Sequence, residues 1–109
     1  MARDEVEAAY FTLLRAREEV TALQRYGEQL AEEARRLERT RREGQALAAQ
    51  ADRRLWRALS DSQTAIDDAT DLRLRVIADE RSQLAERLAA AEAFVRSCEV
   101  DHERLRRSA

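Results

Sequence analysis

Apolar and small residues recur along the first half of the chain at alternating intervals of three and four residues. A hydrophobic pattern that repeats about every 3.5 residues is typical of a long helix packed along another helix. From residue 6 to residue 58 the repeat has no skipped step. Its two rows are Val6, Leu13, Val20, Gly27, Ala34, Arg41, Ala48 and Leu55, and Ala9, Ala16, Leu23, Leu30, Leu37, Gly44, Ala51 and Ala58. We therefore expect a coiled-coil protein.

The last third of the chain has a heptad pattern of its own. Its rows are Leu74, Arg81, Leu88, Val95 and His102, and Ile77, Leu84, Ala91, Cys98 and Leu105. Between the two patterns, residues 60–64 (Ser-Asp-Ser-Gln-Thr) favour a turn, because Ser, Asp and Thr side chains hydrogen-bond nearby backbone groups. We expect an all-α fold, an antiparallel two-helix coiled-coil hairpin. It would form one domain over residues 1–109, with helices at about 3–58 and 64–107 and the turn at about 59–63.

Two alternatives to this hairpin stay open. The first register continues almost unbroken through Ser62, Ala65, Ala69, Leu72 and Val76, which would suit a single uninterrupted helix. The acidic residues between 61 and 71 would also make the hairpin tip similar to the coiled-coil fingers that enter the secondary channel of RNA polymerase. Those proteins usually add a second domain or a zinc site, and a solvated turn is the competing interpretation.

The composition supports long helices and limits the function classes. Charged residues make up 39% of the chain and aromatic residues 5%, with no proline and two glycines, as in coiled coils. A seam this narrow leaves an isolated hairpin marginally stable, so we expect a helical bundle with a second chain or a protein partner, and we expect a homodimer. The net charge of −2 gives no case for direct DNA binding. The charged start and the lack of a long apolar run predict a cytoplasmic protein without membrane contact.

Large apolar residues outside the seam are candidates for contact with another protein. The first turns carry more apolar surface than a seam needs. Two further aromatic residues, Trp56 and Phe94, follow later in the chain. We name Tyr10, Phe11, Leu14, Trp56 and Phe94 as partner-binding residues. A wider buried face inside a bundle is the alternative interpretation of the first three.

Residues for catalysis or metal binding are scarce. Cys98 and His102 are four apart, a spacing that offers two metal ligands on one helical face. Both lie in the apolar seam and the chain has no second Cys or His, so seam packing is the better interpretation. No glycine-rich phosphate loop and no scaffold for a nucleophile is evident. We expect no enzymatic activity, no metal and no required cofactor.

One face of the first helix carries a spacing pattern that suggests a ligand. Glu18, Ala22, Arg25, Gln29 and Glu33 follow at intervals of four, three, four and four, on the outside of the helix. Here the chain resembles the actinobacterial RsiG-type anti-sigma factors, whose helical hairpin carries Glu-x3-Ser-x2-Arg-x3-Gln-x3-Asp repeats. Ala22 replaces the serine, Glu33 replaces the aspartate, and the second helix has no second copy. A solvated face of ion pairs is the competing interpretation.

The resemblance implies a function. It implies a regulatory protein that binds a sigma factor, with cyclic di-GMP as a regulatory ligand held by these five residues. A guanine edge offers N–H donors to a carboxylate and N7 and O6 acceptors to an arginine. A single copy of the motif implies that two chains each contribute one site. The alternative is a self-associating structural coiled coil, a scaffold or adaptor without a nucleotide ligand.

Overall fold

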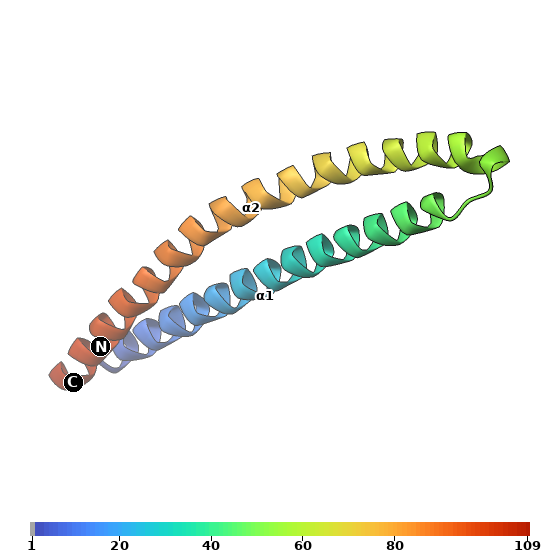
Figure 1. Cartoon of the computed structure of the whole chain (residues 1–109). Coiled ribbons are helices and arrows are strands. Elements are labelled where there is room, and N and C mark those ends of the chain that lie inside the picture. The colour runs from blue at the N-terminus through green and yellow to red at the C-terminus, as the bar shows by residue number, and fades with distance from the viewer. Residues whose placement is uncertain (1) are drawn as a thin grey trace. The chain divides into compact units, whose positions relative to one another are not determined.

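The computed structural model describes residues 2–109, which form two α-helices joined by a short connection (Figure 1). Helix α1 runs over Ala2–Ala49 and helix α2 over Arg53–Ser108. The fold class expected from the heptads, an antiparallel two-helix hairpin, is confirmed. The alternative of one uninterrupted helix is wrong, because the helix is broken at residues 50–52. Neither described helix is long and apolar enough to cross a membrane.

The turn predicted at residues 59–63 is wrong, since the chain reverses at residues 50–52. The amide of Gln50 donates to the carbonyl oxygens of Ala46 and Leu47 at 3.3 and 3.2 Å, which closes α1. The carbonyl of Asp52 accepts the amides of Leu55 and Trp56 at 2.9 Å, which opens α2. The helix bounds expected at 58 and 64 therefore both move toward the N-terminus.

The residues expected to turn are helical for a physical reason. Thr64 Oγ1 donates to the carbonyl of Ser60, four residues earlier, at 2.9 Å. A hydroxyl that bonds back to the preceding turn satisfies itself without breaking the helix. The acidic residues at 61–71 consequently lie along α2 and not at the tip, which removes the basis for the likeness to polymerase-channel fingers.

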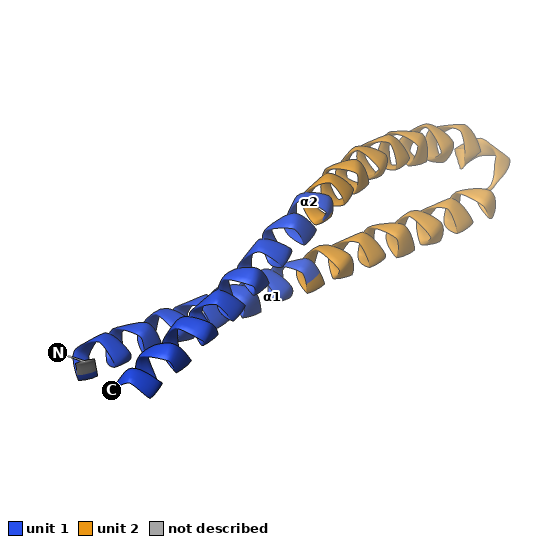
Figure 2. Ribbon diagram, turned by 90° about the vertical axis from the view of Figure 1, so that its left-hand side faces the viewer, with its two compact units in different colours: residues 1–27, 82–109 blue, residues 28–81 orange. Residues whose placement is uncertain are grey.

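Contacts divide the chain into two compact units (Figure 2). Unit 1 comprises Met1–Gly27 and Ser82–Ala109, and unit 2 comprises Glu28–Arg81. In each unit a segment of α1 pairs with a segment of α2. The expectation of a single domain stays a prediction, as does assembly with a second chain.

The seam of unit 1 is apolar, as the heptads predict. Leu13, Ala16 and Cys98 form one buried cluster against which Val95 packs. Further along, Leu84 lies over Gly27, where a Cβ atom would stand 3.1 Å from Leu84 Cδ2. A glycine lets the two helices approach closely at this level. The buried residues of this unit are Leu13, Ala16, Leu23, Leu84 and Cys98.

The seam of unit 2 changes character along its length. Leu30 and Ile77 are buried as expected. Toward the connection, α2 presents polar residues to α1, and their side chains are buried or half-buried: Ser60, Gln63, Asp67 and Thr70. The α1 residues that face them are those of the predicted seam, with Leu37, Arg41, Gly44 and Ala48 half-buried.

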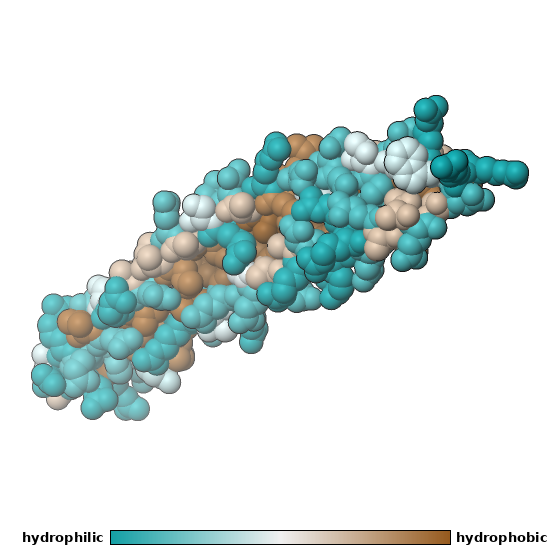
Figure 3. Space-filling view, in the orientation of Figure 1, coloured by the Kyte–Doolittle hydropathy of each residue, from teal (hydrophilic) through white to brown (hydrophobic). Residues whose placement is uncertain are grey.

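Some predicted seam positions that lie on α2 are wrong. Leu55 and Ala58 are exposed, because the helix that would have carried them has already ended. Arg81 is also exposed. The residues that continue the first register on α2 are all exposed: Ser62, Ala65, Ala69, Leu72 and Val76. Figure 3 shows one face of the molecule, where apolar patches interrupt a largely hydrophilic surface.

Candidate functional site

Three residues of the motif-like spacing lie in unit 1, on the exposed face of α1. Glu18, Ala22 and Arg25 are exposed, while Leu23 between them is buried in the seam. Within residues 2–109, no hydrogen bond or ion pair holds the Glu18 carboxylate or the Arg25 guanidinium. Both groups therefore lie on the outside of the helix, as the sequence predicts.

The other two residues of the spacing lie in unit 2 and differ from each other. Gln29 is exposed. Glu33 is half-buried and accepts two hydrogen bonds from Arg73 of α2, at 3.2 Å from Nε and 2.7 Å from Nη2. The hydrogen bond from Arg73 lowers the pKa of the Glu33 carboxyl below its ordinary value of 4.5. Glu33 thus joins α1 to α2, a role that the sequence analysis did not foresee.

A groove lined by arginines lies in unit 2 and was also missed. It has a volume of about 480 Å³. Its lining residues are Ala31, Ala34, Arg35, Glu38, Arg39, Arg42, Leu74 and Arg81. The one carboxylate, Glu38, is bound to Arg41 at 2.8 Å, so the groove carries an excess of positive charge. The eight arginines between residues 35 and 57 were the available signal, but the contribution of Arg81 depends on the helix register.

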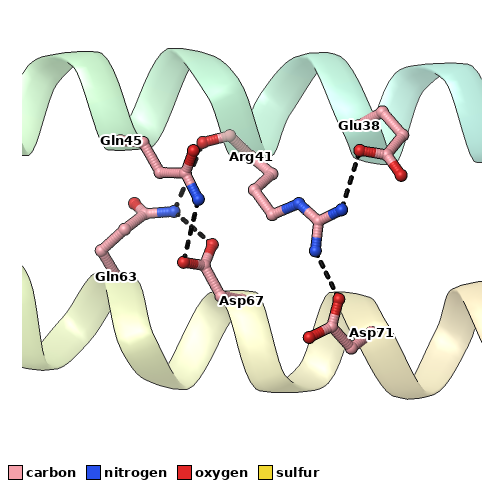
Figure 4. Close-up of polar contacts among 6 residues, drawn as sticks. All are labelled: Glu38, Arg41, Gln45, Gln63, Asp67 and Asp71. Carbon is pink, nitrogen blue, oxygen red and sulfur yellow. Dashed lines mark hydrogen bonds and ion pairs between the residues drawn. The ribbon is translucent and has the colours of Figure 1, made fainter.

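A polar network joins the two helices of unit 2 near this groove (Figure 4). Arg41 binds Glu38 on its own helix and Asp71 on α2. Both carboxylates raise the pKa of Arg41, Glu38 more than Asp71. Gln45 and Gln63 donate to Asp67 at 3.1 and 2.9 Å. The sequence analysis correctly placed Arg41 in the seam, where it is half-buried.

The residues named as partner anchors are spread over both units. Tyr10, Phe11 and Phe94 are exposed in unit 1, while Leu14 is half-buried there and Trp56 is exposed in unit 2. Tyr10 contacts Phe11 and His102, with ring centroids 5.9 and 5.7 Å apart. In unit 1 an aromatic group of Tyr10 and Phe11 is therefore open to contact with another protein.

Cys98 and His102 make different contacts. Cys98 is buried with Leu13 and Ala16 in the seam, and His102 packs against Tyr10. Among residues 2–109, no group of three or more His, Cys, Asp or Glu side chains is placed to hold a metal ion. Seam packing accounts for Cys98.

The chain was compared with models of protein families, with curated proteins and with solved structures. None of the three comparisons finds a match.

Proposed function

We propose that this chain is a non-enzymatic regulatory binding protein that acts like an RsiG-type anti-sigma factor, holding a sigma factor and responding to cyclic di-GMP. The observation that carries the proposal is the open hydrogen-bonding surface of α1. Glu18 and Arg25 are exposed and unengaged in unit 1, and Gln29 is exposed in unit 2.

The chemistry of these groups suits a guanine base. A carboxylate accepts the N–H donors of the guanine edge, an arginine donates to N7 and O6, and a glutamine amide does both. Ala22 supplies no hydrogen bond, so it would only let the ligand approach the helix. Glu33 is bound to Arg73, so a ligand would have to displace that arginine to use its carboxylate.

The arginine groove of unit 2 supports an anionic ligand independently. Arg39, Arg42 and Arg81 line the groove, and within the described residues none of the three forms an ion pair. Guanidinium groups bind phosphate in a bidentate manner and stay charged at every physiological pH. In unit 1, the exposed rings of Tyr10, Phe11 and Phe94 would serve as anchors for the sigma factor, since aromatic residues dominate binding energy at interfaces.

Isothermal titration with cyclic di-GMP, on the chain alone and with a candidate sigma factor, tests the proposal. Arg25→Ala should weaken nucleotide binding about fivefold or more, because one bidentate contact to guanine is worth about 1–3 kcal/mol. Arg87→Ala, an exposed arginine of α2 in unit 1, is the control and should bind as the wild type does. Absence of heat with both ligands, or undiminished binding by Arg25→Ala, would refute the proposal.

A second candidate function is a self-associating structural coiled coil. A specific observation favours it: in unit 2, α2 exposes large apolar residues, with Leu72 at 61% and Val76 at 45% of full exposure. Sedimentation equilibrium would show the oligomer. A sigma factor that splits this oligomer would favour regulation over a purely structural role.

A further inference from the structure

The side of α2 that faces away from α1 in unit 2 carries an apolar row of its own. We call it the outer row; it consists of Ala58, Ser62, Ala65, Ala69, Leu72 and Val76. All six residues are exposed, and Ile66 beside them is 49% exposed. The row follows the heptad intervals of three and four, which keep one stripe of a helix directed at a partner helix. No segment of unit 2 covers it.

The outer row differs from the row that binds α1. The residues of α2 directed at α1 are Ser60, Gln63, Asp67 and Thr70, which are more polar than the outer row. A helix that contributes polar groups to its own hairpin and apolar groups to the outside is patterned for two neighbours. The second neighbour must offer an apolar helical stripe of similar length.

We propose that a second copy of this chain covers the outer row, with the two α2 segments antiparallel and Ala65 of each copy opposite Ala69 of the other. Counting outward, Ser62 then lies opposite Leu72, and Ala58 opposite Val76. Each large side chain therefore meets a small one, which is the alternation that close packing requires. A two-fold axis makes every one of these contacts occur twice.

Charges beside the outer row agree with this register. Asp61 of one copy lies on the same flank as Arg75 of the second copy, and the symmetry repeats the pair. Both side chains are exposed, and no ion pair within residues 2–109 engages either. Ile66 meets its own counterpart on the other flank. One contact opposes association, since Asp68 faces Asp68 at the centre.

Two other arrangements pair the side chains less well by size. A shift by one heptad sets Leu55 against Leu72 and Ala58 against Ala69, large on large and small on small. The same shift brings Arg54 to Arg75 and Asp61 to Asp68, all of like charge. A parallel pair stacks Leu72 on Leu72 and leaves the small residues between positions 58 and 69 without a large partner. The shift in the opposite direction also sets large against small, with Leu72 on Ala69 and Val76 on Ala65, and it brings Asp68 to Arg75, but it leaves Ala58 and Ser62 without partners in the row. The register with Ala65 opposite Ala69 pairs all six residues of the outer row.

This inference rests on the self-association offered above as the second function, and it does not depend on nucleotide binding. The first test is disulfide trapping in a Cys98→Ala background, which removes the only native thiol. Ala65→Cys chains mixed with Ala69→Cys chains should form a cross-linked dimer under mild oxidation, because facing Cβ atoms lie within disulfide range. Either variant alone should cross-link much less.

The outcomes of the trapping separate the alternatives. Efficient cross-linking by Ala65→Cys alone would show a parallel pair and overturn the register. A dimer in sedimentation that traps in no combination would show that another register or another surface is used, and it would overturn the proposed register. A monomer at millimolar concentration would refute the self-association itself. Circular dichroism of each variant confirms that the helices are intact.

Charge reversal supplies a second test. Restoration of the dimer by a second, compensating substitution would not be expected if the first substitution acted through a folding defect. Asp61→Arg should raise the dimer dissociation constant about fivefold or more, because two attractive contacts become repulsive. Adding Arg75→Asp in the same chain should restore the wild-type constant. Glu86→Arg, an exposed site in unit 1, is the control and should change nothing. Failure of the double variant to recover would contradict the proposed pairing of Asp61 with Arg75.

Discussion

The two units join the same pair of helices with different chemistry. In unit 1 the contact is a continuous apolar seam, with Leu13, Ala16 and Cys98 buried together. In unit 2 the seam is apolar at Leu30 and Ile77 but polar toward the connection, where Arg41 donates to Asp71 and Gln45 donates to Asp67 across the two helices.

This difference means that one unit stabilises the helix pair while the other exposes apolar residues to a second chain. Fully burying an aliphatic side chain contributes about 1.5–3 kcal/mol, whereas an exposed ion pair contributes about 0–1 kcal/mol. Unit 1 therefore supplies most of the helix–helix stability. In unit 2, α2 contacts α1 through polar residues. Its apolar residues there consequently lie on the exposed side of the helix, where another chain can contact them.

The largest expected effect comes from truncating one leucine in each unit, which tests whether unit 1 supplies more of the stability than unit 2. Leu13→Ala, in the buried cluster of unit 1, should lower the free energy of unfolding by about 2–5 kcal/mol, since it removes buried methyl groups and leaves a cavity. Leu72→Ala, on the outer row of unit 2, should change it by less than about 0.5 kcal/mol. Urea unfolding at low protein concentration, followed by circular dichroism, measures both.

The same Leu72→Ala protein should nevertheless dimerise more weakly than the wild type. Unchanged stability of the single chain together with a weaker dimer would distinguish a side chain that contacts a second copy from one that is merely exposed. A loss of stability equal to that of Leu13→Ala would contradict the division of roles between the units.

The second prediction concerns the replacement of a polar residue in the seam of unit 2 by an apolar one. Arg41→Leu should raise the urea midpoint, because a leucine at this half-buried position restores the heptad and Glu38 and Asp71 remain solvated. Arg35→Leu is the control, since that arginine is exposed and binds Glu32 on its own helix. A lower midpoint for Arg41→Leu would mean that the polar contacts outweigh the apolar packing.

The difference between the units also decides what the sequence could predict. From Val6 to Ala48 every seam residue was identified correctly, because the heptads run unbroken and face one partner. On α2 the predicted rows from Leu74 to Leu105 were also identified correctly, except at Arg81. Between residues 55 and 73 the pattern misled, since the outer row continues the register of α1 across the connection while the contact with α1 uses polar residues. Hydrophobic periodicity identifies a stripe, but it does not say which neighbour covers it.

The candidate site was predictable to a similar extent. The exposed positions of Glu18 and Arg25 follow from the heptad of α1 alone. The pairing of Glu33 with Arg73, and the approach of Arg81 to the arginine groove, depend on where the chain reverses. A turn placed about nine residues too late displaces every partner on α2, so these contacts could not be read from the sequence.

A third prediction concerns pH. The folded state holds the pKa of Glu33 below its ordinary value of 4.5, through the hydrogen bond from Arg73. A depressed carboxyl pKa stabilises the fold above the unfolded value, and that contribution is lost as the pH falls through the folded value. Glu33→Gln should therefore lose less stability between pH 7 and pH 3 than the wild type does. Urea midpoints measured across this range test the difference.

The partner variant separates the ion pair from other causes. Arg73→Gln should reduce the acid sensitivity as Glu33→Gln does, because either change removes the same bond between α1 and α2. If the Glu33→Gln protein keeps the full acid sensitivity of the wild type, the contact does not contribute to the stability of unit 2.

The smallest expected effect concerns Asp68, the one residue that opposes the proposed pairing of outer rows. In that register the two Asp68 carboxylates meet at the two-fold axis, where like charges destabilise by a few tenths of a kcal/mol. Asp68→Asn should lower the dimer dissociation constant about twofold, as measured by sedimentation equilibrium. Because the repulsion is between exposed charges, the gain should shrink as salt rises, whereas a packing effect would persist. A tighter dimer at low salt alone would thus place Asp68 at the axis, and a dissociation constant that does not change would place it elsewhere.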